Sequence, residues 1–517
     1  MTFEIVFVLL SLLGMVAALI ADKMRPGMIL FSVVVLFLCA GILTPKEMLE
    51  GFSNKGMITV ALLFLVSEGI RQSGTLGQVI KKLLPQGKTT VFKAQLRILP
   101  SVAFISAFLN NTPVVVIFAP IIKHWAKSVN LPATKFLIPL SYVTILGGIC
   151  TLIGTSTNLV VHGMILEAGF EGFSMFELGK VGIFIAIAGI IYIFLFSKRL
   201  LPDARPDTAV PDEEVEEGEK LHRVEAVLGA RFPGINKKLK DFNFQRHYGA
   251  EVKEIKTRNG QRFVTNLDDV VLHEGDTLVV MADDTFIPTW GESSVFVLLT
   301  NGNEPDTSGK KKRWFALLLL VLMIVGATVG ELPVTKEMFP DIKLDMFFFV
   351  SITTIIMAWT NLFPARKYTK YISWDILITI ACAFAISKAM VNSGVADCVA
   401  GFIIGLSDDY GPHVLLAILF VITNLFTELI TNNAAAALAF PLALSISAQL
   451  GVSPTPFFVV ICMAASASFS TPIGYQTNLI VQGIGNYKFT DFVRIGLPLN
   501  IITFLISVIL IPLIWNF

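Results

Sequence analysis

The chain has 517 residues, of which 54% are hydrophobic and 15% charged, and its mean hydropathy is +0.71. Soluble domains carry about 25% charged residues, so the composition excludes a soluble protein and predicts an integral membrane protein. The formal net charge of +1 gives no sign of a nucleic-acid partner. The five cysteines show neither pairing nor metal-ligand spacing, and we expect no disulfide framework.

Ten apolar stretches are long enough to cross a hydrocarbon core of roughly 30 Å, which takes about 20 apolar residues. In chain order they lie near residues 3–21, 27–44, 57–73, 134–164, 174–197, 314–331, 344–363, 373–390, 456–484 and 491–515. Two further apolar stretches, 93–127 and 411–448, carry polar residues in the middle. We expect each of these two to form a hairpin that enters and leaves the membrane on the same side.

A polar segment divides the apolar stretches into two groups. Residues 199–220 are acidic and contain prolines, a composition typical of a flexible linker. Residues 221–290 carry strand and turn signals that predict a small α+β domain, and residues 291–313 predict a second linker. Within the domain we expect strands at 223–228, 251–256, 262–264 and 277–281, a short helix over 233–244, and a hairpin turn at Asn259–Gly260.

Basic residues predict the orientation, because short cytoplasmic loops are enriched in Lys and Arg. With the inserted domain in the cytoplasm, the basic loops around residues 23–25, 71–88, 123–127, 366–370 and 488–494 also lie inside. The loops that remain outside are poor in Lys and Arg. We therefore expect a multi-pass protein of the plasma membrane, the inner membrane in a bacterium, with a cytoplasmic inserted domain and both termini outside.

The membrane part of the sequence is duplicated. The stretch from Thr151 to Met164 recurs as the stretch from Thr471 to Ile484, with eight of fourteen positions identical. Five spans per copy is an odd number, so the two copies are inverted relative to each other. We predict an all-α polytopic membrane protein of two inverted repeats, residues 1–198 and 314–517. Each has five transmembrane helices and a re-entrant hairpin, and a small cytosolic α+β domain is inserted between them.

Polar, helix-breaking residues interrupt both copies at matching places, namely 110–113, 154–158, 431–433 and 470–478. Unwound backbone at bilayer depth is tolerated only where it is buried in protein or lines a cavity. Amide oxygens, hydroxyls and free carbonyls suit an alkali cation, while N–H groups and helix N-termini attract an anion. These breaks therefore predict the binding site of a secondary transporter, although Asn and Thr also hydrogen-bond helices together in ordinary bundles.

Glu428 is the one acid in the first arm of the second hairpin. A buried carboxylate in a membrane indicates a function by default, here either as a proton carrier or as support for the hairpin tip. Its counterpart in the first copy falls near Ala107, and this asymmetry favours support.

The paired tip motifs, the prolines that follow them and the two Gly-x-x-x-Asn breaks resemble the divalent anion:sodium symporters, the dicarboxylate and sulfate carriers. The resemblance covers both membrane halves. It implies a Ser-Asn-Thr triplet at each tip that helps to bind the substrate and lines a sodium site completed by the next break. The matching residues are Asn110, Asn111 and Thr112 in the first copy and Thr431, Asn432 and Asn433 in the second. The sequence departs from the triplet at Asn110, Thr431 and Asn433.

The inserted domain is similar to the TrkA C-terminal (RCK-C) domain, through the stretches 223–227, 233–236, 248–252 and 274–280. This resemblance implies a module that binds a small regulatory ligand or dimerises, with a plain spacer as the alternative. Symporters with such inserts are often assigned to sulfate.

Taken together, we expect a sodium-coupled symporter for a small divalent oxyanion, with sulfate preferred, working as an elevator-type homodimer. Sodium ions are the coupling ions, and no other cofactor is expected. The expected substrate residues are Asn110, Asn111, Thr112, Thr155, Ser156, Thr431, Asn432, Asn433, Tyr475 and Gln476. The expected sodium residues are Asn111, Gly154, Asn158, Asn432, Gly474 and Asn478.

Three alternatives stay open at this point. The first is a C4-dicarboxylate symporter, and the second is a cation/proton antiporter that uses Glu428. The third is a potassium channel, which the inserted domain suggests but for which no Thr-Val-Gly-Tyr-Gly filter occurs. An enzyme is not expected, because the six histidines form no metal pair and no Ser/His/Asp arrangement stands out.

Overall fold

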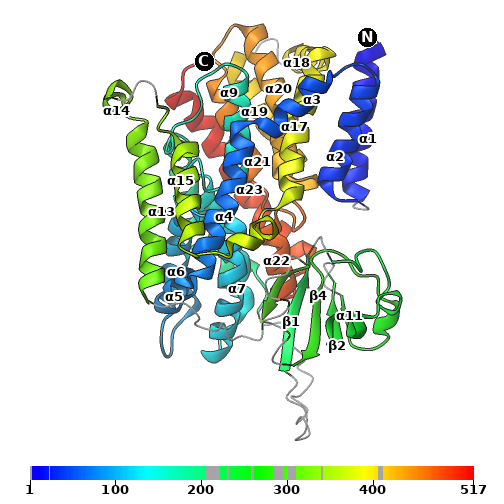
Figure 1. Cartoon of the computed structure of the whole chain (residues 1–517), viewed down its shortest axis with the longest axis vertical. Helices are drawn as coiled ribbons and strands as arrows, with labels where there is room; N and C mark the ends of the chain where they lie inside the picture. Colours follow the sequence, from blue (N-terminus) through cyan, green and yellow to red (C-terminus); the bar gives the residue numbers. More distant parts are fainter. Residues whose placement is uncertain are drawn as a thin grey trace, which may run out of the picture.

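The computed structural model describes residues 3–21, 24–203, 222–229, 232–257, 261–283, 286, 290, 295–300, 310–338, 342–405 and 411–517. These residues form a bundle of helices with a small sheet domain at one end, and both chain termini lie at the opposite end (Figure 1). An odd number of crossings on each side of the inserted domain produces this arrangement.

The helices follow the predicted duplication. The first copy contains α1 (Phe3–Ala21), α2 (Pro26–Cys39), α3 (Pro45–Glu50), α4 (Lys55–Gln72), α5 (Thr75–Leu83), α6 (Val91–Ser106), α7 (Asn111–Ser128), α8 (Leu137–Gly148), α9 (Ser156–Glu167) and α10 (Gly179–Leu200). The second copy contains α13 (Lys310–Gly330), α14 (Pro333–Met338), α15 (Met346–Trp359), α16 (Tyr368–Tyr371), α17 (Trp374–Asn392), α18 (Val395–Gly405), α19 (Gly411–Leu429), α20 (Asn432–Leu450), α21 (Thr455–Ser466), α22 (Gln476–Gly485) and α23 (Phe489–Ile514). Among the described residues, eight helices are long and apolar enough to cross a membrane.

Two of the predicted spans are broken near their middle. The stretch 134–164 divides into α8 and α9, and the stretch 456–484 divides into α21 and α22. Both interruptions coincide with the predicted polar breaks at 154–158 and 470–478. The membrane part is thus a polytopic helical fold with half-length helices that begin inside the bundle.

Each predicted hairpin is a pair of helices joined by a short tip. α6 and α7 are joined through residues 107–110, and α19 and α20 are joined through residues 430–431. α6 and α7 lie toward the sheet domain, whereas α19 and α20 lie toward the end that holds the termini (Figure 1). The two hairpins therefore enter the bundle from opposite ends, as an inverted repeat requires.

Two glycines at equivalent positions turn the chain sharply after a span. Gly74 follows α4 with φ 69° and Gly394 follows α17 with φ 76°. Glycine adopts this left-handed conformation without the steric cost of a side chain. The turns lead into α5 and α18, which connect the preceding spans to the hairpins.

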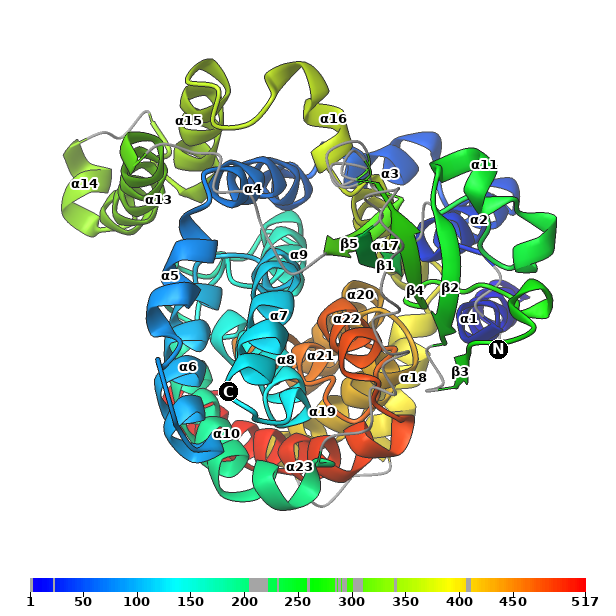
Figure 2. The same cartoon turned by 90° about the horizontal axis from the view of Figure 1, so that it is seen from below.

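Helices of the two copies pack against each other in matching pairs. α2 packs on α17 as α15 packs on α4, and α7 packs on α22 as α20 packs on α9. Figure 2 shows the hairpins and the broken spans gathered together, with α10 beside α23. We call α6–α10 with α19–α23 the hairpin bundle, and α1–α4 with α13–α17 the outer helices.

The inserted domain is built on one antiparallel sheet. Its strands are β1 (His222–Leu228), β2 (Glu251–Lys256), β3 (Arg262–Phe263), β4 (Thr277–Ala282) and β5 (Phe296–Thr300), in the order β3-β2-β4-β1-β5. The sheet has its own core, in which Phe232, Phe242, Phe244, Tyr248 and Phe296 pack together. β1 to β4 coincide with the four predicted strands.

Two expectations for the inserted domain are corrected by the structure. The stretch 233–244 is not a helix. It contains turns and the single 3₁₀ turn η3 (Leu239–Asp241), and the α-helix α11 covers only Phe244–Tyr248. Asn236 has a left-handed φ of 61°, and its N–H bonds the Leu272 carbonyl at 2.7 Å, so this backbone pairs with a neighbouring segment instead of coiling.

The sheet also extends beyond residue 290, where a linker was expected to begin. β5 pairs with β1, with Ala226 opposite Leu299. The sequence of β5 is a short apolar run that the boundary placed at residue 290 excluded. The predicted turn at Asn259–Gly260 lies outside the described residues.

Candidate functional site

The tip of the first hairpin is tied to the break that follows it. Ser106, at the end of α6, donates a hydrogen bond from Oγ to Oδ1 of Asn111, the first residue of α7, at 2.7 Å. The Thr151 hydroxyl donates to the Ala107 carbonyl and accepts from the Gly154 N–H at 3.1 Å. These bonds hold the tip and the break together as one polar unit.

The second copy repeats the same contacts at the equivalent residues. Thr427 Oγ1 donates to Asn432 Oδ1 at 2.8 Å, and the Gly474 N–H donates to Thr471 Oγ1 at 3.3 Å. Thr471 Oγ1 in turn donates to the carbonyl oxygen of Glu428 at 3.0 Å. The repeat in the sequence is therefore also a repeat of a hydrogen-bond network.

The glycines of the first break let backbone and side-chain oxygens approach closely. A Cβ on Gly154 would lie 2.5 Å from the carbonyl oxygen of Gly148, and a Cβ on Gly148 would lie 2.7 Å from Asn111 Oδ1. Real Cβ atoms do not approach oxygen this closely, so both positions require glycine. The result is a cluster of oxygen atoms between the tip and the break.

Asn158 and its counterpart Asn478 complete the two clusters in different ways. Asn158 is fully buried, and its Nδ2 donates to the Thr151 carbonyl at 2.9 Å, but its Oδ1 has no hydrogen-bond partner among the described residues. Asn478 Oδ1 instead accepts from Ser141 Oγ at 2.7 Å. A buried oxygen without a partner is costly unless something binds it, and oxygen ligands are what hard cations prefer.

The tips and breaks also meet across the two copies. Asn111 Nδ2 donates to Tyr475 Oη at 2.6 Å, and Thr112 Oγ1 donates to Gln476 Oε1 at 3.3 Å. In the other direction, the Ser156 hydroxyl donates to Asn433 Oδ1 at 3.3 Å. The first tip thus contacts the second break, and the second tip contacts the first break.

Four helices begin at this meeting point: α7 at Asn111, α9 at Ser156, α20 at Asn432 and α22 at Gln476. Within the described residues, none of the four residues at the N-cap positions makes a side-chain cap bond, the residues being Asn110, Thr155, Thr431 and Tyr475. The first N–H groups of a helix have no partner inside the helix, and the positive end of the helix dipole lies there. The tips and breaks contain neither Lys nor Arg.

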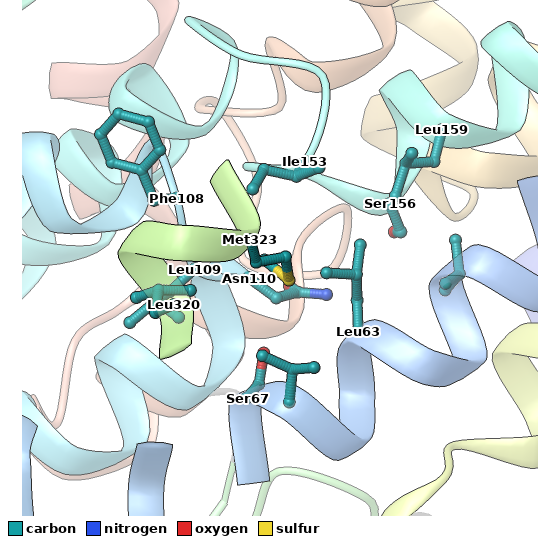
Figure 3. A pocket seen from close by; sticks show the side chains of 12 residues that line it. Leu63, Ser67, Phe108, Leu109, Asn110, Ile153, Ser156, Leu159, Leu320 and Met323 are labelled. Carbon is teal, nitrogen blue, oxygen red and sulfur yellow. The ribbon is translucent and has the colours of Figure 1, made fainter. Parts of the chain in front are cut away.

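Asn110 and Ser156 also face the outer helices. Both line a small cavity between the hairpin bundle, α4 and α13, together with Leu63, Ser67, Leu320 and Met323 (Figure 3). The cavity has a volume of about 10 Å³, which is room for one water molecule. The structure therefore brings most predicted substrate residues to the meeting of the two copies and turns Asn110 toward the boundary between bundle and outer helices.

Known transporters match most of the chain. Residues 16–448 and 343–517 match the model of the citrate transporter family, CitMHS. The chain belongs to the citrate transporter family. This transporter is 30% identical to an uncharacterised transporter of Synechocystis, over 94% of the chain and 93% of that protein.

Two further relatives of the transporter carry substrate names. A probable sodium/sulfate cotransporter of Chlamydomonas reinhardtii is 24% identical over 93% of the chain and 85% of its own length. A sodium-dependent dicarboxylate transporter of Staphylococcus saprophyticus is 25% identical over 28% of the chain and 28% of its own length.

Glu428 of the transporter supports the second break. Its Oε1 accepts from the Ser470 N–H at 2.8 Å and from Asn500 Nδ2 at 2.6 Å. In the first copy the equivalent N–H, of Cys150, bonds the Gly147 carbonyl at 3.0 Å, so no side chain is needed there. The asymmetry between Glu428 and Ala107 thus matches a difference in backbone. Oε2 of Glu428 is buried and has no hydrogen-bond partner among the described residues.

Ser106, Thr427 and Ser141 also contact the candidate site, although they are absent from the residues expected from the sequence. Ser106 and Thr427 each precede the central Asn of a tip by five positions, so their matched hydroxyls carried a signal in the repeat. Ser141 lies on α8 and contacts Asn478 of the other copy, and no local pattern announces that contact.

Proposed function

We propose that the chain is a sodium-coupled symporter for a small divalent oxyanion, with sulfate preferred. The observation that carries this proposal is the meeting of four uncapped helix N-termini in a site without Lys or Arg. Each N-terminus carries roughly half a positive charge, so four offset about two negative charges. That number fits a dianion, and the N–H groups supply donors for its oxygens.

We also propose that sodium binds at the two tip-and-break clusters, because amide, hydroxyl and carbonyl oxygens gather there. The first site would use Asn111, Gly154 and Asn158 with the Ser106 hydroxyl, and the second would use Asn432, Gly474 and Asn478 with the Thr427 hydroxyl. The partnerless Asn158 Oδ1 supports a cation at the first site. Sodium bound at both sites adds positive charge beside the helix N-termini, and this increases the affinity for the anion.

The small size of the cavity supports an alternating-access cycle in which the hairpin bundle moves against the outer helices. The two bodies meet at a cavity of about 10 Å³ that Asn110 and Ser156 line, and a sulfate ion needs more room than one water molecule. We propose that the protein is a homodimer in the plasma membrane, the inner membrane of a bacterium. The inserted domain is cytoplasmic and regulatory, and it resembles the RCK-C domain.

Sulfate is preferred over a C4-dicarboxylate because a named sodium/sulfate cotransporter aligns over most of the chain, whereas the named dicarboxylate transporter aligns over about a quarter of it. The C4-dicarboxylate symporter remains the second candidate. The cation/proton antiporter is the third candidate: Glu428 Oε1 is engaged in holding the break, while Oε2 is buried without a partner among the described residues.

Uptake into proteoliposomes tests the proposal. An inward sodium gradient should drive uptake of radiolabelled sulfate, and replacement of sodium by choline should abolish it. Asn111→Ala and Asn432→Ala should each remove the sodium dependence. Sodium-driven proton movement without any anion would refute the symporter.

A further inference from the structure

One hydroxyl group lies between the central asparagines of both hairpin tips. Tyr475 Oη accepts a hydrogen bond from Asn111 Nδ2 at 2.6 Å, and the Thr155 hydroxyl lies 3.0 Å away. The Asn432 side chain also lies close to it. Thr155 is the equivalent of Tyr475 in the first copy, so a small side chain in one copy corresponds to a large one in the other.

The bonding pattern leaves the phenol proton available. The hydroxyl accepts from Asn111, and it has one proton of its own to donate. That proton can go to Thr155 or to the oxygen of a bound anion. The side-chain oxygen of Asn111, Oδ1, accepts from Ser106 instead. Tyr475 therefore contacts the tip through Asn111 Nδ2 and leaves the oxygen cluster proposed for sodium unoccupied.

We propose that Tyr475 limits the substrate to a small tetrahedral oxyanion and donates a hydrogen bond to it. This inference rests on the proposed symport function and specifies its substrate class. A C4-dicarboxylate carries its two charges at separated ends and would reach toward both tips at once. The rigid phenol ring stands between the tips and blocks that arrangement, whereas sulfate concentrates both charges in one compact group.

Two substitutions separate the size of the ring from its hydroxyl. Tyr475→Thr introduces the residue of the first copy and opens the space, so the ratio of succinate to sulfate uptake should rise at least tenfold. Tyr475→Phe keeps the ring and removes the donor, so sulfate affinity should fall about tenfold while succinate stays excluded. Both variants should keep their activation by sodium, which also shows that they fold.

The uptake ratios decide between the outcomes. An unchanged succinate-to-sulfate ratio in Tyr475→Thr would overturn the size limit, as would succinate uptake by the unsubstituted protein equal to that of sulfate. Absence of sodium-dependent uptake of either anion by the unsubstituted protein would instead refute the proposed function itself.

A separate observation concerns the inserted domain, which is bound to two helices of the hairpin bundle. Lys123 on α7 places its Nζ 2.9 Å from both carboxylate oxygens of Glu225 on β1, and Lys256 on β2 lies 3.5 Å from the same group. Burial opposes ionisation of Glu225, but the two lysines outweigh it and lower its pKa to about 2. The contact is charged and partly buried.

The second helix in contact with the domain is α22. A Cβ on Gly275 would lie 2.6 Å from Leu479 Cγ, and a Cβ on Gly483 would lie 2.6 Å from Thr277 Oγ1. α22 therefore packs directly on the beginning of β4, with glycine on each side of the contact.

Both helices also begin at the candidate site. α7 starts at Asn111 and α22 at Gln476, and Lys123 lies twelve residues, or about 18 Å along the helix, from Asn111. We infer that the inserted domain moves with the hairpin bundle as one body and joins the two helices, one from each copy. A ligand on the domain would then act on the site through α7 and α22.

A disulfide tests this inference, which also rests on the proposed alternating access. The Cβ positions of residues 277 and 483 are 3.9 Å apart, within the range of about 3.5–4.5 Å that disulfides adopt. In a Cys39→Ser background, Thr277→Cys with Gly483→Cys should form this disulfide on oxidation and keep sodium-driven sulfate uptake within twofold of the reduced protein. The matched control is Thr277→Cys alone.

Two results would overturn the inference. Failure of the disulfide to form in folded protein would contradict the contact, and loss of uptake on oxidation with recovery on reduction would show that the domain and the bundle move apart. Absence of uptake in the reduced double variant and in the unsubstituted protein alike would refute the symport function instead.

Discussion

The two asparagines that follow the breaks offer a matched test of the sodium sites. In the protein without sodium, Asn158→Ala removes one hydrogen bond, to the Thr151 carbonyl, and also removes an oxygen that has no partner among the described residues. A typical hydrogen bond contributes about 1 kcal/mol, and an unpaired buried oxygen costs about as much. The two effects nearly cancel, so the free energy of unfolding should change by less than about 1 kcal/mol.

Asn478→Ala should behave differently. Asn478 donates to the carbonyls of Ser468 and Thr471 and accepts from Ser141. Loss of three hydrogen bonds costs about 3 kcal/mol at roughly 1 kcal/mol each, and this loss is present without any ion. The structure thus predicts that the second variant is the less stable one in choline chloride.

Thermal unfolding of purified protein in sodium chloride and in choline chloride at equal ionic strength measures both effects. A sodium concentration ten times the dissociation constant stabilises the folded state by about 1.4 kcal/mol per site. Asn158→Ala should lose the stabilisation of about 1.4 kcal/mol that sodium at the first site provides, while it keeps its stability in choline chloride. Full sodium-specific stabilisation in Asn158→Ala would refute the first sodium site.

Three further predictions follow from the contacts of the site and of the inserted domain. Glu428→Gln keeps an oxygen for the Ser470 N–H and should retain sodium-dependent uptake with an unchanged pH profile, whereas a proton carrier would lose its transport. Gly154→Ala places a Cβ 2.5 Å from the Gly148 carbonyl oxygen and should abolish sodium-dependent uptake. The control Gly14→Ala has open space around its Cβ and should behave as the unsubstituted protein. Equal uptake by the two variants would contradict the close approach of Gly154 to Gly148. Because the pKa of Glu225 is lowered from 4.5 to about 2, its stabilisation of the domain contact is complete above pH 4.5 and is lost as the pH falls toward 2. The stability lost in Glu225→Gln, measured by thermal unfolding, should therefore be the same from pH 8 to pH 5. A loss that shrinks within that window would contradict the ion pair.

The sequence was sufficient for the repeat, the hairpins and the position of both breaks. Apolar runs of membrane length identify the spans, and Gly, Pro, Asn and Thr inside them mark where helices stop. The duplication added the inversion, because an odd number of spans reverses the second copy. The four main strands of the inserted domain were readable because each predicted run contains valine or isoleucine and lies beside turn residues.

Contacts between distant segments were not readable. Asn111 and Tyr475 are 364 positions apart, and nothing in the local pattern of either break announces the bond between them. Lys123 reads in the sequence only as a charge on the inner side, yet the structure pairs it with Glu225, 102 positions away. Residues 233–244 were mistaken for a helix because their pairing with residues 270–272 is likewise a tertiary contact.

Calorimetry of sulfate binding to the purified protein, in sodium chloride and in choline chloride, is the decisive test of sodium-coupled sulfate binding. Sodium and sulfate share one site region, so each should increase the affinity for the other by the same factor. We predict that sulfate binds in sodium chloride and that binding disappears in choline chloride, and equal affinity in the two salts would contradict sodium coupling.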